Sequence, residues 1–237
     1  MTASATAGPT HEADQHRRVI VMIGAPGAGK GTQAERLSEV LGLPHVSTGK
    51  LFRAAVRSEG ELGREVRDFV AAGALVPDEI AVRVLDGRVH EADAAAGAIL
   101  DGFPRTRQQA VALDEMLARA DDKVVAALYV EVTTDELINR LAGRRICTLD
   151  DQHVYHVVAM PPKEEGICDI DGAPLRQRDD DLPETLRKRL ARQLAPMYEV
   201  VDHYAENGRL FPVRGDLAAD EVTEELLRAL AISERIA

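Results

Sequence analysis

The chain has 237 residues, of which 45% are hydrophobic and 29% are charged, and its formal net charge is −11. This size suits one α/β domain with a small insertion, or at most two domains. The negative net charge argues against nucleic-acid binding over a large surface. No run of about 18 apolar residues predicts a membrane span. The N-terminal stretch also lacks the apolar core of a secretion signal. With only two cysteines, we expect a protein of the reducing cytoplasm.

The first 17 residues differ in composition from the rest of the chain. Residues 1–17 are rich in Ala, Thr, Gly and His and show no periodicity, which predicts a disordered tail. We expect the folded domain to occupy residues 18–237.

A glycine-rich loop follows the first predicted strand. Residues 19–23 form a continuous apolar, β-branched run, and residues 24–32 read Gly-Ala-Pro-Gly-Ala-Gly-Lys-Gly-Thr before a stretch of helix formers. Glycines let successive backbone N–H groups point at one anion, and a helix N-terminus adds the positive end of its dipole. The order of strand, glycine loop and helix therefore predicts a phosphate site. Lys30 would reach the outer phosphates and Thr32 could hold Mg²⁺.

The remaining predicted elements alternate between strands and helices. Apolar runs predict strands at residues 43–49 (entering a loop), 98–101, 124–132 and 209–213. Helices are predicted at residues 79–90, 106–118, 134–141 and 184–205, within 50–72 as two short segments, and around 222–230. Thr48 and Asp78 are the expected N-terminal caps of the helices that follow them. Residues 143–181 are rich in Pro, Gly, Asp and His with short alternating runs, which predicts a small β insertion. Alternating strands and helices imply a parallel sheet with helices on both faces.

Charged side chains follow these strands and motifs. Asp101 ends an apolar run, where a carboxylate holds Mg²⁺ through water in P-loop folds. Ligands bind at the carboxyl ends of strands in open α/β sheets, so we expect Gly24, Thr48 and Gly102 to gather at one edge. Arginines from five separate segments lie beside motifs: Arg53, Arg105, Arg144, Arg178 and Arg189. Converging arginines and Mg²⁺ are what phosphoryl transfer requires.

Five motifs, in order along the chain, resemble the adenylate kinases of the long-lid, bacterial type. They are residues 24–32, Ser47-Thr48-Gly49, Asp101-Gly102-Phe103-Pro104-Arg105, Gly143-Arg144-Arg145 and Arg178-Asp179-Asp180-Asp181. The resemblance covers about residues 18–230 and implies a P-loop nucleoside monophosphate kinase fold with a five-stranded parallel sheet. It also implies an AMP-binding helical insertion at residues 47–76 and a β lid at residues 143–181. The implied reaction is Mg·ATP + AMP ⇌ 2 ADP, without a covalent enzyme intermediate. A single folded domain with a mobile lid also suggests a monomer.

The resemblance assigns roles to individual residues. ATP would be held by Gly27, Ala28, Gly29, Lys30, Gly31, Thr32, Arg144, Val154, Tyr155 and Leu217. AMP would be held by Thr48, Arg53, Ala74, Leu75, Val76, Gly102, Phe103, Pro104, Arg105, Gln109, Arg178 and Arg189. Phosphoryl transfer itself would depend on Lys30, Asp101, Arg105, Arg144, Arg178 and Arg189.

Lys50 departs from the pattern of this family. It stands where the family usually has an Asp that is thought to help the water shell of Mg²⁺. Either the cation disturbs that network, or Lys50 turns out to solvent and Asp101 suffices.

The predicted lid also departs from the pattern of this family. Cys147, Asp150, Cys168 and Asp171 stand where many relatives carry two Cys-x-x-Cys pairs that bind structural zinc. Two thiolates and two carboxylates could still bind Zn²⁺, although the sequence favours a metal-free polar cluster, and a disulfide is a third alternative. His153 and His156 are expected on the lid surface rather than as ligands.

Two other functions stay open alongside the adenylate kinase reaction. A UMP/CMP kinase shares the fold, although the long lid and Gln109 favour AMP. A regulatory nucleotide-binding protein without turnover is the alternative from a different class, and Lys50 is the feature that favours it.

Overall fold

The computed structural model describes residues 17–58, 60–150, 153–178 and 181–236. Residues 1–16 of the predicted tail, together with Asp179 and Asp180 of the last motif, lie outside the described residues. Arg17, predicted as the last residue of the tail, is held in place: its backbone N–H and its guanidinium both donate to the carboxylate of Asp122, at 2.9 and 2.6 Å. Among the described helices, none has the length and apolar character needed to cross a membrane.

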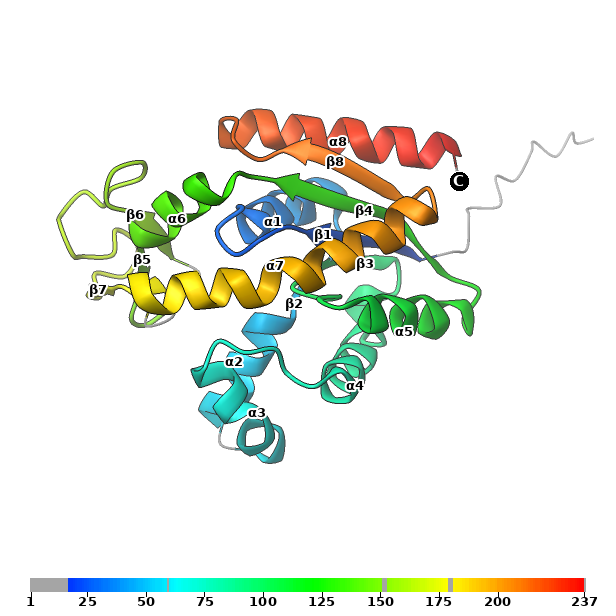
Figure 1. Ribbon diagram of the computed structural model, residues 1–237, viewed down its shortest axis with the longest axis horizontal. Helices are drawn as coiled ribbons and strands as arrows, with labels where there is room; N and C mark the ends of the chain where they lie inside the picture. Colours follow the sequence, from blue (N-terminus) through cyan, green and yellow to red (C-terminus); the bar gives the residue numbers. More distant parts are fainter. Residues whose placement is uncertain (1–16, 59, 151–152, 179–180, 237) are drawn as a thin grey trace, which may run out of the picture.

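The centre of the fold is a parallel sheet of five strands (Figure 1). In spatial order the strands are β2 (His45–Ser47), β3 (Gly97–Asp101), β1 (Arg18–Ile23), β4 (Lys123–Glu131) and β8 (Leu210–Arg214). Each neighbouring pair is parallel, which confirms the predicted sheet. The register pairs Met22 with Asp101, so Asp101 lies at the carboxyl edge next to the loop that follows β1.

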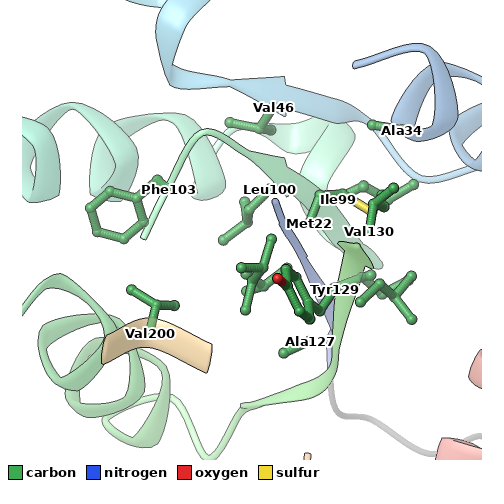
Figure 2. Packing of buried hydrophobic residues seen from close by; sticks show 14 of the residues in the cluster. Met22, Ala34, Val46, Ile99, Leu100, Phe103, Ala127, Tyr129, Val130 and Val200 are labelled. Carbon is green, nitrogen blue, oxygen red and sulfur yellow. The ribbon is translucent and has the colours of Figure 1, made fainter. Parts of the chain in front are cut away.

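Aliphatic side chains form the core on both faces of this sheet. Val19 to Ile23 of β1 and Ala126 to Val130 of β4 are buried almost completely. Figure 2 shows side chains of the central strands, including Met22, Leu100 and Tyr129, gathered between Ala34 of the first helix and Val200 of a long helix. Because both faces of the strands are buried, their sequences are continuous apolar runs rather than alternating ones.

Helices cover both faces of the sheet, as predicted. On one face α1 (Lys30–Leu41) packs against α8 (Ala219–Ile236), and on the other α5 (Arg107–Ala118) packs against α7 (Pro183–Glu206). Two further helices are α4 (Asp78–Val89), which packs against α5, and α6 (Thr134–Ala142), which packs against α7. A short 3-10 helix, η1 (Ala92–Ala94), precedes β3.

Two parts of the chain project from the layered core (Figure 1). Helices α2 (Thr48–Ser58) and α3 (Glu61–Ala71) pack on each other below the sheet in this view. Between α6 and α7, strands β5 (Arg144–Cys147), β6 (Val154–His156) and β7 (Leu175–Arg176) form a separate antiparallel sheet in the order β6-β5-β7. We call residues 143–181 the lid segment.

Two helix starts differ from the predicted capping. Thr48 was expected to cap a helix, but it is the first residue of α2 and its hydroxyl donates to the carbonyl of Gly102 at 2.8 Å. Asp78 was expected to cap α4, but Pro77 holds that position and the Asp78 carboxylate instead contacts α5 and the residue that caps it. Both side chains join segments that are distant in sequence.

Candidate active site

The loop between β1 and α1 has the backbone that only glycine adopts easily. Gly24 and Gly27 have φ angles of 153° and 87°. A Cβ atom would lie 2.8 Å from the carbonyl oxygen of Val130 at Gly24, and 2.8 Å from the Leu141 side chain at Gly27. Helix α1 begins directly afterwards at Lys30, so its unpaired N–H groups and positive dipole end face the loop. This arrangement can bind a phosphate group.

Lys30 is the cation at the centre of the site. Its ammonium donates to the carbonyl of Ala25 at 2.9 Å. Burial lowers the pKa of Lys30 to about 8; the charge of Asp101 opposes this shift, whereas Arg105, Arg189 and Arg144 add to it. Lys30 and these charges come from four different segments, so the fold brings three of the five arginines that were predicted to converge close to Lys30. Their mutual repulsion favours an anionic ligand between them.

Asp101 is the acidic group beside Lys30. Its Oδ2 lies 3.4 Å from Nε2 of His45, and a Cβ at Gly31 would be 3.6 Å from the same oxygen. Burial raises the pKa of Asp101, but the His45 hydrogen bond and the charges of Lys30, His45 and Arg105 together hold it below its usual value. An ionised carboxylate next to the phosphate loop suits Mg²⁺, which prefers oxygen ligands and waters. Thr32, exposed in the first turn of α1, offers a hydroxyl on the same loop.

A cavity with about 640 Å³ of empty space, including its open mouth, lies between α2, α3, α5 and α7. From the residues predicted for AMP, the lining includes Thr48, Arg53, Ala74, Leu75, Val76, Gly102, Phe103, Arg105, Gln109, Arg178 and Arg189. Within the described part of the chain, Pro104 is not among the lining residues. The cavity has both apolar walls and arginines, as a nucleoside monophosphate requires.

Sequence reasoning missed several lining residues: Gly49, Phe52, Val70, Gly73, Ala81 and Gln193. Gln193 could have been found, because it follows Arg189 by one helical turn and therefore shares its face of α7. Its side chain donates to the carbonyl of Gly73 at 3.1 Å. Phe52 and Val70 look like ordinary core positions of short helices, so the sequence carries no signal for their role.

Asp181 holds two of the predicted arginines at the end of the lid segment. It is fully buried and accepts two hydrogen bonds from Arg144, both at 2.7 Å, and one from Arg189 at 3.4 Å. The sequence placed Asp181 in a motif without giving it a role. The structure makes it the residue that positions Arg144 and Arg189 relative to each other.

Arg105 is positioned by the loop after β3. Its Nε donates to the carbonyl of Gly102 at 2.8 Å, which also accepts the Thr48 hydroxyl. Burial lowers the pKa of Arg105, with Asp101 opposing this and Arg53 and Arg178 adding to it. The Arg105 guanidinium therefore lies close enough to Arg53 and Arg178, which also line the cavity, to be affected by their charges.

A cluster of polar side chains in the lid segment could hold a metal. One ligand atom each from Cys147, His153, Cys168 and Asp171 lies within 4.8 Å of the others. Here the structure differs from the expected set: His153 is a member rather than a surface residue, and it takes the place expected for Asp150. Asp150 lies outside the group, with its Oδ2 3.7 Å from Nε2 of His153.

The cluster is internally hydrogen-bonded. Nδ1 of His153 lies 3.0 Å from Oδ2 of Asp171 and 3.4 Å from Sγ of Cys168, and Sγ of Cys147 lies 3.2 Å from the Asp171 carboxylate. Both cysteines are free thiols. Two thiols, one imidazole and one carboxylate are ligand types that zinc accepts. His156 instead supports the backbone: its Nδ1 accepts from the N–H groups of Val158 and Ala159.

Three residues predicted to meet ATP occupy different environments. The Tyr155 phenol is directed into the lid segment, 3.5 Å from Sγ of Cys168, and accepts from the backbone N–H of Asp169 at 2.8 Å. Its phenol therefore helps to order the lid segment, and the predicted contact of Tyr155 with ATP stays a prediction. Val154 is exposed on β6, and Leu217 packs against the core after β8.

Lys50 takes a position that the sequence did not predict. Its ammonium lies 2.7 Å from Oε1 of Glu35, so it joins the first turn of α2 to α1. It is paired with a carboxylate of the helix that begins at the phosphate loop, not turned out to solvent.

Comparisons with known proteins agree with this geometry. A family model described as adenylate kinase matches residues 22–209. The chain is 46% identical over 211 residues to an adenylate kinase of Streptomyces coelicolor, covering 89% of this chain and 97% of that protein. The adenylate kinase of Staphylococcus aureus strain Mu50 is 44% identical over 211 residues, covering 89% and 98% respectively. With a phosphate loop, converging cations and a match along most of its length, this chain belongs to the adenylate kinase family.

Proposed function

We propose that this protein transfers the γ-phosphoryl group of ATP reversibly to AMP in the presence of Mg²⁺, giving two ADP. The observation that carries the proposal is the shared electrostatic environment of Lys30, Asp101 and the arginines beside the cavity. Phosphoryl transfer needs little covalent chemistry and depends on positioning and on charge stabilisation. This constellation supplies both.

The two nucleotides would occupy neighbouring sites. ATP phosphates would lie in the loop formed by Gly27, Ala28, Gly29, Lys30, Gly31 and Thr32, with the backbone near Leu217 beside the adenine. AMP would fill the cavity between α2, α3, α5 and α7, with its phosphate toward Arg53 and Arg105. Residues 47–76 and 143–181 then act as the AMP-binding insertion and the ATP lid.

The side chains have separable roles in the transfer step. A phosphate oxygen of AMP attacks the γ-phosphorus in line, while the bond from that phosphorus to the β,γ-bridging oxygen breaks and ADP leaves. Lys30, Arg144, Arg178 and Arg189 stabilise the negative charge that spreads over the transferring oxygens. Asp101 and Thr32 would hold Mg²⁺, which when bound neutralises phosphate charge. Movement of the lid segment over the site would exclude water, which otherwise hydrolyses ATP.

The test is an assay of ADP formation from Mg·ATP with AMP, UMP or CMP as acceptor, with ADP measured by a coupled enzyme. We expect turnover with AMP to exceed that with the pyrimidine nucleotides. A preference for UMP or CMP would assign the protein to the pyrimidine alternative. Nucleotide binding without ADP formation from any acceptor would assign it to a regulatory role.

We also propose that the lid segment binds one zinc ion. The sequence favoured a metal-free cluster, but the participation of His153 adds a third good zinc ligand to the two thiols. Metal content after purification without chelator tests this. A stoichiometry near one in the native protein, falling in Cys168→Ser, supports the site; a value near zero in both removes it.

The high negative charge supports two further parts of the proposal. Like charges keep proteins apart and repel nucleic acid, so a net charge of −11 favours a monomer that acts on small nucleotides. Free, buried thiols suit a reducing cytoplasm. A dimer in sedimentation analysis at micromolar concentration would contradict the monomer.

A further inference from the structure

In the wall of the cavity, the side-chain amide of Gln109 accepts one hydrogen bond and donates another. Its Oε1 accepts from the backbone N–H of Arg105 at 2.7 Å. Its Nε2 donates to Oδ1 of Asp78 at 2.7 Å. The side chain lines the cavity while being almost wholly buried, so its orientation determines what the cavity presents at this point.

The two partners allow only one orientation of the amide. The N–H of Arg105 can only donate, and an ionised carboxylate such as Asp78 can only accept. Exchanging the amide oxygen and nitrogen of Gln109 would place two donors together at Arg105 and two acceptors together at Asp78. Unmatched buried polar groups are costly, so this exchange is strongly disfavoured.

Asp78 is itself held in place by a second contact. Its Oδ2 accepts from the hydroxyl of Thr106 at 3.1 Å, and Thr106 in turn accepts from the backbone N–H of Gln109 and caps α5. Asp78 is the first residue of α4, and Val76 and Ala81 on either side of it line the cavity. The amide is therefore presented beside apolar lining residues, where a base rather than a phosphate would lie.

Each polar atom of the Gln109 amide retains one further hydrogen-bonding capacity. A carbonyl oxygen accepts two hydrogen bonds and an amide nitrogen donates two, and one of each is used by Arg105 and Asp78. An adenine ring offers an amino donor next to a ring-nitrogen acceptor, which complements this pair. Hypoxanthine, guanine and uracil offer a carbonyl acceptor next to an N–H donor, which is the reverse.

We propose that Asp78 is a positioning residue that makes the cavity select amino bases over keto bases by fixing the Gln109 amide. This rests on the proposed function, since it concerns the base of the phosphoryl acceptor. Asp78 need not touch the nucleotide: it acts through the hydrogen bond to Nε2 of Gln109.

The experiment compares AMP with inosine monophosphate, which differs only in carrying a keto group and a ring N–H where AMP has an amino group and a bare ring nitrogen. The ratio of kcat/KM for AMP to that for inosine monophosphate is measured in the native enzyme, Asp78→Ala and Asp78→Asn. We expect Asp78→Ala to lower this ratio about tenfold, since one fixed hydrogen bond contributes roughly that factor. KM for ATP should not change. Asp78→Asn keeps an acceptor oxygen and should retain the native ratio.

Calorimetric binding of AMP and inosine monophosphate gives the same comparison without turnover, and thermal unfolding shows whether each variant is folded. A native ratio in folded Asp78→Ala would overturn the proposal, as would a ratio in Asp78→Asn as low as that of Asp78→Ala. Should Asp78→Ala not fold, Gln109→Leu decides: its ratio should approach one, and a native ratio would contradict the role of the amide. If the native enzyme neither binds nor phosphorylates AMP, the proposed function fails as well, which distinguishes that result from a failure of Asp78 alone.

Discussion

The sheet core and the lid segment are stabilised by different forces. Buried aliphatic side chains from all five strands and the helices around them form one continuous core. Among the described residues of the lid segment, the buried cluster consists of Cys147, Tyr155, Cys168 and Ala173, with the partly buried Leu175 packed against it. So small an apolar cluster cannot offset the entropy of ordering the segment, and hydrogen bonds or a metal must supply the rest.

This difference relates directly to the proposed mechanism. A site that binds polyphosphate needs a rigid base, and β1, the glycine loop and β3 are built into the large core. A cover over that site must open for exchange of nucleotides, and segments with little apolar burial open most easily. We therefore expect substitutions in the two regions to have separable effects.

The largest expected effect is on the stability of the sheet core. Leu128 of β4 is 0% exposed, and Leu128→Ala should lower the free energy of unfolding by about 2–5 kcal/mol. The matched control is Leu149→Ala in the lid segment, where the side chain is 77% exposed and the change should stay within about 0.5 kcal/mol. Urea unfolding measures both. Equal losses in the two variants would contradict the contrast between the regions.

Lys30→Met separates activity from stability. We expect turnover to fall by roughly 10²-fold or more, as for loss of a preorganised donor. Stability should not fall, because burial disfavours the charged form of Lys30. Steady-state kinetics and thermal unfolding test the two halves. The exposed Lys188 is the control, and Lys188→Met should retain native turnover.

The titration of Lys30 gives a pH dependence with a defined sign. Its pKa in the folded protein is about 8, below the ordinary value of 10.5, so kcat/KM for ATP should decline above about pH 8. Between about pH 8 and pH 10.5, Lys30 is protonated in the unfolded chain but largely deprotonated in the folded protein. The free energy of unfolding should therefore rise with pH across that range. Lys30→Arg stays charged and should lose the basic limb of the profile. A limb that persists in this variant would exclude Lys30 as its source.

A smaller effect is expected from Tyr155→Phe in the lid segment. The change removes the phenol oxygen near Sγ of Cys168 and its hydrogen bond from the N–H of Asp169. We expect a local loss of about 1 kcal/mol, the usual net value of one hydrogen bond. Hydrogen exchange should become faster for lid amides while the amides of β1 and β4 stay unchanged. Faster exchange throughout the sheet would show that the two regions unfold together.

The smallest effect concerns the ion pair between α1 and α2. Lys50 and Glu35 are both partly exposed, so their coupling in a double-mutant cycle of Lys50→Gln and Glu35→Gln should be about 0.2–1 kcal/mol. Because Lys50 pairs with Glu35, the Mg²⁺ dependence of turnover should be native in Lys50→Gln. A marked change in that dependence would restore the alternative in which Lys50 disturbs the metal site.

Much of the fold and the site could be predicted from sequence alone. The strands are recognisable because burial on both faces requires unbroken apolar runs, as in residues 19–23 and 98–100. The phosphate loop is recognisable because its glycines and Lys30 are contiguous in sequence. The order of strands and helices then brings Asp101 to the same edge, since parallel strands end on one side of a sheet.

Only the tertiary structure determined which polar groups became partners. His153 rather than Asp150 joins the two thiols, Lys50 finds Glu35, and Asp78 orients Gln109 instead of capping a helix. Sequence periodicity reports whether a side chain is buried, but it carries no information on which of several donors or acceptors lies within about 3 Å. That choice depends on how distant segments pack, which is why the lid cluster and the amide of Gln109 emerged only in three dimensions.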